Sequence, residues 1–143
     1  SPDGSTVVYR ANPEQNFALY TKATTGVAKE QLLSKLDQDV SQVTDWSADG
    51  QFILFTVNDP VNGNDIWYLP ISGDRKPKPL LQTRFNEGSA RFSPDGRWVT
   101  YQSTESGAPQ IYAVPFPTAT SYACAMRPSL SRNKGRAAST DKT

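Results

Sequence analysis

Short apolar runs alternate along most of the chain with polar segments rich in glycine, proline and asparagine. The runs contain mainly Val, Ile, Phe, Tyr and Trp, a composition typical of β-strands. The run Phe52 to Phe55 ("FILF") is apolar at consecutive positions, so we expect both faces of its sheet to be buried. The pattern predicts an all-β protein built from short antiparallel strands.

A turn motif, S-x-D-G, repeats in step with these runs. It begins at Ser1, Ser47 and Ser93, so the spacing is 46 residues each time, within the range typical of repeat architectures. In the middle repeat, four runs follow one another through short turns, which predicts a four-stranded meander. Four-stranded sheets repeated at this period are typical of β-propeller blades. An aromatic residue follows eight positions after each serine, at Tyr9, Phe55 and Tyr101.

One segment also fits a helix. Leu32, Leu33 and Leu36 stand at helical spacing among residues that favour helix. In the repeat, however, this segment occupies the place of an outer strand. We therefore predict that "EQLLSK" (30–35) is a strand followed by a loop.

The repeated turn has a conformational explanation. Glycine supplies its left-handed residue, and aspartate favours turns because its carboxylate accepts hydrogen bonds from nearby backbone N–H groups. The alternative is a ring of carboxylates for a metal or for catalysis. On the structural interpretation, the turn residues are Asp3, Gly4, Asp49, Gly50, Asp95 and Gly96.

Composition excludes several kinds of chemistry within these residues. The 143 residues include no histidine and one cysteine, Cys124, so a Ser-His-Asp or Cys-His pair and a multi-cysteine zinc site are excluded. No glycine-rich phosphate loop is present. The segment "NDPVNGND" (58–65) collects oxygen ligands but lacks the spacing of an EF-hand, and a linker between strands explains it as well. We predict no catalytic residue, no metal and no cofactor.

Charge and hydropathy limit the partners. The net charge is +1, which predicts no nucleic-acid partner. No apolar run is long enough to span a bilayer, so direct membrane insertion is not expected.

The repeat resembles a known family. W/F-S-x-D-G followed by an apolar strand, and then I-Y or I-W in the next strand, resembles the TolB-like β-propeller repeat, a Pro-Asp-Gly relative of the Trp-Asp repeat. Similar repeats form periplasmic TolB, the propeller of prolyl-oligopeptidase-type peptidases, and the C-terminal half of some bacterial serine/threonine kinases. The segment "YAVPFP" resembles the "Y-x-x-PFP" strand of those kinases. The segments that carry the resemblance are 45–56, 65–73, 91–103 and 110–117.

This resemblance implies a partial propeller of about three four-stranded blades, the first and last incomplete. The expected blades are 1–37, 38–84 and 85–117, and a closed six-bladed ring would need roughly 276 residues at this period, so a fragment is expected. Residues 118–143 lose the register and have few large apolar side chains. We expect a disordered tail or an out-of-frame product. A third interpretation assigns its basic residues Arg127, Arg132, Lys134 and Arg136 to a nucleic-acid or anionic-surface patch.

The resemblance implies a non-catalytic module for protein interaction or ligand sensing, in a periplasmic or extracytoplasmic location. The alternative is the accessory or sensor propeller of a kinase or peptidase whose catalytic domain is not in this chain. Expected partners are another protein or the missing blades of a longer chain, with self-association of the isolated chain. A site would lie in the loops opposite the D-G turns, namely 10–16, 58–64, 83–89 and 103–109. The candidate contact residues there are Arg84, Phe85 and Glu87, which combine charge with an aromatic ring.

Overall fold

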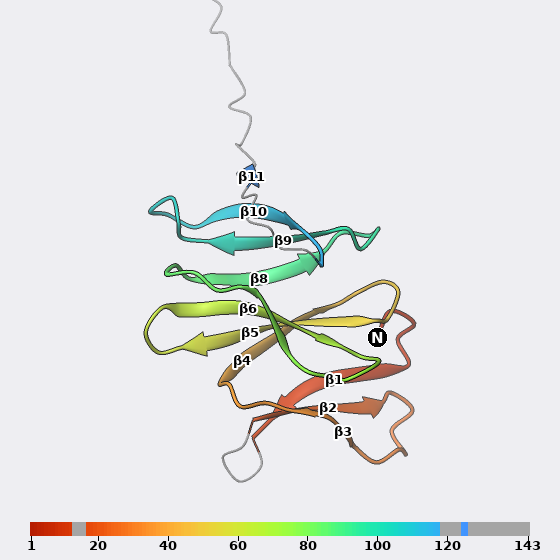
Figure 1. Ribbon diagram of the computed structural model, residues 1–143. Helices are drawn as coiled ribbons and strands as arrows, with labels where there is room; N and C mark the ends of the chain where they lie inside the picture. The colour runs from red at the N-terminus through yellow and green to blue at the C-terminus, as the bar shows by residue number, and fades with distance from the viewer. Residues whose placement is uncertain (13–16, 118–123, 126–143) are drawn as a thin grey trace, which may run out of the picture.

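The computed structural model describes residues 1–12, 17–117 and 124–125. Within these ranges the secondary structure is entirely β, and the strands form three antiparallel sheets. Figure 1 shows the three sheets as successive layers, with the middle sheet between the other two. The predicted all-β partial propeller is confirmed.

Each sheet is a meander in which neighbours along the chain pair with one another. The first sheet contains β1 (Thr6–Ala11), β2 (Ala18–Ala23) and β3 (Gln31–Lys35). The middle sheet contains β4 (Val40–Trp46), β5 (Phe52–Asp59), β6 (Gly63–Pro70) and β7 (Lys78–Leu81). The third contains β8 (Glu87–Phe92), β9 (Trp98–Ser103), β10 (Gln110–Pro115) and the two-residue β11 (Cys124–Ala125). The ambiguous segment 30–35 is a strand, as its place in the repeat predicted.

The middle sheet is packed on both faces. In β5, Ile53 and Phe55 belong to a buried cluster with Leu19 of the first sheet. Between them, Leu54 belongs to a second cluster with Val99 of the third sheet. Successive side chains of a strand point to opposite faces, so the consecutive apolar residues of "FILF" serve two inter-sheet cores. The expectation that both faces are buried is confirmed.

The repeated turn closes the hairpin between β4 and β5. Gly50 has φ of 73°, in the left-handed region that glycine adopts without steric cost. The Asp49 carboxylate accepts hydrogen bonds from the Ser47 hydroxyl at 2.6 Å and the Gln51 N–H at 3.0 Å. These bonds, that of Ser47 foremost, lower the pKa of Asp49. The same local bonds form at Asp3 and Asp95, so the turns themselves account for all three carboxylates.

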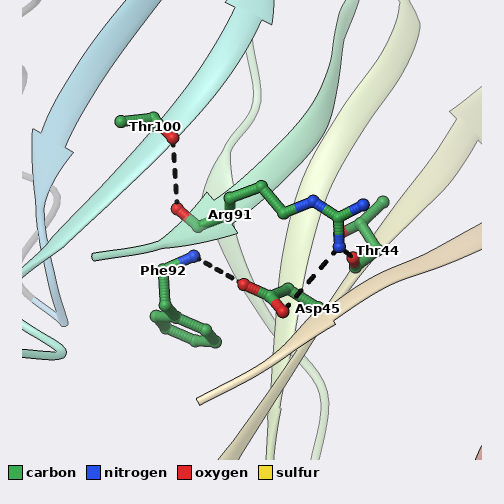
Figure 2. Close-up of polar contacts among 5 residues, drawn as sticks. All are labelled: Thr44, Asp45, Arg91, Phe92 and Thr100. Atoms are coloured by element: carbon green, nitrogen blue, oxygen red, sulfur yellow. Dashed lines mark hydrogen bonds and ion pairs between the residues drawn. The ribbon is translucent and has the colours of Figure 1, made fainter. Parts of the chain in front are cut away.

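Equivalent positions of adjacent repeats join the middle and third sheets. Asp45 and Arg91 are 46 residues apart, and Figure 2 shows their side chains meeting between β4 and β8. Asp45 Oδ2 accepts a hydrogen bond from the Phe92 N–H at 2.8 Å, and Asp45 Oδ1 lies 3.8 Å from Arg91 Nη1. Arg91 also donates to the Thr44 carbonyl. One carboxylate thereby ties two sheets together.

The predicted tail, residues 118–143, lies outside the described residues except for Cys124 and Ala125. The backbone of these two residues pairs with Ala113 and Tyr112 of β10. The third sheet consequently has a fourth strand over two residues only.

Candidate functional site

A cavity of about 300 Å³ lies between the middle and third sheets. It is at the strand ends opposite the S-x-D-G turns, which we call the loop end. The lining residues come from the start of β4, the second half of β5, the start of β6, the start of β8 and the end of β9, and from the segments next to β8 and β9. Among them are Ser41, Thr56, Asn64, Asn86, Glu87 and Gln102.

Three of the four loops predicted to form a site meet here. Asn64 from 58–64, Asn86 from 83–89, and Thr104 from 103–109 all line the cavity. In the fourth loop, residues 13–16 lie outside the described residues. Asn86 holds the other two loops together, since its Oδ1 accepts from the Asn64 N–H at 3.1 Å and its N–H donates to Thr104 Oγ1 at 3.2 Å. Chain segments distant in sequence are thus fixed around one hollow.

Gly63 permits this approach of the loops. Its φ is 97°, and a Cβ at this position would lie 2.3 Å from Asn86 Oδ1. Any larger residue would therefore push Asn86 away from Asn64.

Glu87 is the charged residue of the lining. Its side chain is buried, with 2% exposure. Its Oε1 accepts from Thr83 Oγ1 at 2.5 Å and lies 3.5 Å from Ser103 Oγ. Its Oε2 is buried and has no hydrogen-bond partner among the described residues. Buried carboxylates are normally paired or hydrogen-bonded on both oxygens, so Glu87 has unused capacity to bind a donor.

Burial raises the pKa of the Glu87 carboxyl, because the charged form loses its hydration. The Thr83 hydrogen bond works in the opposite direction, and the negative charge of Asp65 adds to the rise. The environment therefore opposes the ionised form of Glu87.

This shift predicts how Glu87→Gln changes stability with pH. The pKa of Glu87 is raised from its ordinary value of 4.5, so the folded state holds this proton more tightly than the unfolded state. Ionisation then costs stability as pH rises above 4.5, and the full cost is present above the folded-state pKa. Glu87→Gln is expected to raise the melting temperature by a few degrees at pH 7 and to leave it nearly unchanged at pH 4. Thermal unfolding at both pH values measures the difference.

The control is Glu105→Gln, which removes the same charge from a partly exposed residue in the next loop. It should change the melting temperature little at either pH. A lower melting temperature for Glu87→Gln at pH 7 would contradict the claim that ionisation of the buried Glu87 carboxyl costs stability.

The three candidate contact residues do not all line the cavity. The Arg84 guanidinium lies over the Phe85 ring, with 5.1 Å between its Cζ and the ring centroid. Glu87 lines the cavity, whereas Arg84 and Phe85 are not among its lining residues.

Sequence reasoning missed Ser41, Thr56 and Gln102. The spacing of the repeat could have identified these residues. Ser41 and Glu87 are 46 residues apart, as are Thr56 and Gln102, and all four line the cavity. The cavity is therefore built from matching positions of adjacent sheets, and at Glu87 the repeat changes from the hydroxyl of Ser41 to a carboxylate.

Asp65 is a second buried carboxylate that the sequence did not single out. Its side chain is 2% exposed, its Oδ2 lies 3.4 Å from Gln82 Nε2, and its Oδ1 is without a partner in the described part of the chain. Burial raises its pKa. Asp65 directly precedes the apolar residues of "DIWY". A charged residue at the start of a buried apolar run was the sequence feature that could have identified it.

The segment 58–65, which collects oxygen ligands, has its own local hydrogen bonds. Asp59 Oδ1 accepts from the N–H groups of Val61 at 2.7 Å and Asn62 at 3.0 Å, which lower the pKa of Asp59. Among the described residues, no group of three or more His, Cys, Asp or Glu side chains is arranged to hold a metal ion. The same residues include no helix long and apolar enough to cross a membrane.

Comparison with known proteins adds to this geometry. No protein-family model matches the chain. The uncharacterized protein Atu1656 of Agrobacterium fabrum is 30% identical over 123 residues, which cover 80% of this chain and 38% of that protein. A Streptomyces coelicolor protein described as a tricorn protease homolog is 35% identical over 52 residues, covering 36% of this chain and 4% of that protein.

Solved structures share the arrangement of sheets. A protein of Agrobacterium tumefaciens described as a TolB has a TM-score of 0.68 and 26% identity, covering 80% of this chain and 40% of that one. TolB from Acinetobacter baumannii has a TM-score of 0.65 and 23% identity, covering 82% and 28%. The fold is that of a TolB-like β-propeller. The isopeptidase AtxE2 shares this fold at 13% identity and a TM-score of 0.65, covering 88% and 28%.

The chain spans about two fifths of the length of Atu1656 and a small part of the tricorn protease homolog. Its TolB-like neighbours likewise extend well beyond the matched portion.

Proposed function

We propose that the chain is a non-catalytic propeller module that binds a ligand or a protein segment at its loop end. The proposal rests on the cavity between the middle and third sheets. Glu87 lines this cavity, is buried, and has no hydrogen-bond partner at Oε2 among the described residues. Binding sites are concave and contain a small number of placed polar groups. Three loops converge on this one hollow, whereas the carboxylates of the D-G turns are engaged in their own turns.

The non-catalytic character is supported by composition. The chain has no histidine, so its residues cannot form the nucleophile and base pairs that histidine provides. Purified chain is expected to show no hydrolase or kinase turnover. Robust turnover that survives repurification would contradict this part of the proposal. The resemblance to TolB supports an extracytoplasmic location as part of the same proposal.

A random heptapeptide phage library panned against the immobilised chain tests where binding occurs. Selected peptides would be mapped by hydrogen exchange. We expect slower exchange in segments 58–64, 83–89 and 103–109, and unchanged exchange in the D-G turns 47–50 and 93–96. Protection confined to the D-G turns, or no selected peptide, would contradict the proposal.

A second candidate is the accessory propeller of a peptidase. It is favoured by the matches to a protein described as a tricorn protease homolog and, in fold, to an isopeptidase. In that case the loop-end site would present or admit a peptide to a catalytic domain elsewhere. The gene sequence on both sides of the coding segment tests it: an in-frame hydrolase domain supports this candidate, and an in-frame kinase domain would favour the kinase alternative instead.

We also propose that the isolated chain self-associates through the outward face of the third sheet. Trp98 and Ile111 on this face are 43% and 51% exposed. Phe52, which is 46 residues before Trp98, packs edge to face on Phe116 of the next sheet at 5.0 Å. A second copy of the chain would give Trp98 an equivalent neighbour, continuing the stacking of the sheets.

Sedimentation velocity measures this association. The wild-type chain is expected to form dimers or larger species as its concentration rises, and Trp98→Glu is expected to shift the population towards monomer. Val61→Glu, at an exposed loop position, is the control. A wild-type chain that stays monomeric at all concentrations would contradict the association.

A further inference from the structure

The two junctions between sheets offer an internal comparison at the loop end. Arg10 of β1 and Thr56 of β5 are 46 residues apart and hold the same place in the repeat. At the first junction the Arg10 guanidinium donates to the carbonyl of Val40 and lies 5.7 Å from the Phe17 ring centroid. The junction between the first and middle sheets therefore contains a cation supplied by the chain itself.

The second junction differs at both matching positions. Thr56 replaces the long cationic side chain, and Glu87 stands where the first junction has Ser41. Val40, whose carbonyl accepts from Arg10, corresponds to Asn86, and Thr56, Asn86 and Glu87 all line the cavity. The short side chain leaves space, and the substitution of carboxylate for hydroxyl adds negative charge to that space.

The chemistry of the lining selects a positively charged donor. Hydroxyl and amide side chains such as Ser41, Asn64 and Gln102 line the cavity together with Glu87, and among the described residues no lysine, arginine or aromatic residue lines it. An anion would find no opposite charge, and a sugar or base would find no ring to stack on. A metal ion is disfavoured because no three-ligand group exists in the described chain.

The size of the cavity also fits a compact group on a chain. Its volume is about 300 Å³, at the lower limit of small-molecule sites. Glu87 Oε2 is buried and has no partner in the described part of the chain, so a donor that reaches it would form a charge-assisted hydrogen bond, the strongest kind available to a carboxylate. An ammonium or guanidinium brings several further donors, which the surrounding hydroxyl and amide oxygens can accept.

We propose that this cavity binds an alkyl-linked cation, a primary ammonium or guanidinium group, through Glu87. The inference rests on the proposed loop-end binding function and names the ligand chemistry of that site. The bound cation occupies a position at the second junction similar to that of Arg10 at the first junction, but it comes from outside the chain. Its source is either a lysine or arginine side chain of a peptide or a free alkyl amine.

The test is a titration of the full chain followed by amide chemical shifts. The probes are capped lysine, capped arginine and n-butylammonium, with capped norleucine as the neutral probe and capped glutamate as the anionic probe. The cationic probes are expected to shift the amides of Ser89 and Thr104 and to bind at least tenfold more tightly than norleucine. Tighter binding of capped lysine than of n-butylammonium indicates a peptide side chain, and equal binding indicates a free amine.

Three variants test the role of Glu87. Glu87→Gln is expected to weaken the cationic probes at least tenfold, while Glu105→Gln, which removes the same charge outside the cavity, should change binding by less than twofold. Thr56→Arg should abolish binding because its tethered guanidinium fills the place, as Arg10 does. Equal binding of lysine and norleucine, or unchanged binding by Glu87→Gln, would overturn the inference.

The two proposals can fail separately. A neutral or anionic probe that shifts Ser89 and Thr104 more than the cations do would overturn the ligand chemistry and leave loop-end binding standing. If neither the probes nor the selected heptapeptides act at the loop end, both proposals are contradicted.

Discussion

Phe55→Ala is expected to lower the free energy of unfolding by about 3–5 kcal/mol, the range for truncating a fully buried phenylalanine. Phe55 is fully buried in the centre of β5. It packs in the cluster between the first and middle sheets, beside Ile53 and Leu69. Loss of this ring leaves a cavity in the layer that holds the two sheets together. Urea unfolding followed by tryptophan fluorescence measures the change.

Two variants control this measurement. Phe55→Leu keeps most of the buried volume and should cost clearly less than Phe55→Ala. Val61→Ala, at a side chain that is 86% exposed, should change the free energy of unfolding by less than about 0.5 kcal/mol. Equal effects of Phe55→Ala and Val61→Ala would mean that the first and middle sheets do not pack as described.

Asp45→Ala is expected to lower the free energy of unfolding by about 1–3 kcal/mol, the cost of leaving a partly buried donor without its acceptor. The donor is the Phe92 N–H, which Asp45 Oδ2 accepts at 2.8 Å (Figure 2). Its loss would loosen the third sheet from the middle sheet. Urea unfolding measures the cost, and faster hydrogen exchange at the Phe92 amide would locate it.

Arg91→Ala separates the hydrogen bond from the ion pair. The Arg91 side chain is 64% exposed and its Nη1 lies 3.8 Å from Asp45 Oδ1, so water screens this pair and it contributes roughly 0–1 kcal/mol. Arg91→Ala should therefore cost less than Asp45→Ala. The reverse order would show that Arg91, through its ion pair with Asp45 and its hydrogen bond to the Thr44 carbonyl, joins the sheets more strongly than the bond to Phe92 does.

The fold could be predicted because the repeat carries local and periodic signals together. The S-x-D-G turns mark the hairpins, and the 46-residue register decided between helix and strand at residues 30–35 where local propensity favoured helix. Consecutive apolar residues at Ile53 to Phe55 revealed a sheet buried on both faces. These features depend on neighbours along the chain or on exact repetition, and a single sequence contains both.

The site could be predicted only in part. Three of the loops opposite the turns contribute to the cavity lining, as does Glu87, but Arg84 and Phe85 lie outside the lining, with the Arg84 guanidinium over the Phe85 ring. The criterion of a charge next to an aromatic ring selected Arg84 and Phe85, whose side chains contact each other. The sequence did not identify Ser41 and Thr56, because small polar residues belong to no recognisable motif. They line the cavity only because one sheet packs on the next. A comparison of each repeat position for changes of chemistry would have identified Glu87 and Thr56 together.

The most direct test of loop-end binding through Glu87 is a crystal structure of the chain with a selected heptapeptide. We predict a basic side chain or a terminal amine of the peptide within hydrogen-bonding distance of Glu87 Oε2, between the middle and third sheets. A peptide bound at the D-G turns, or one that leaves Glu87 without a partner, would contradict it.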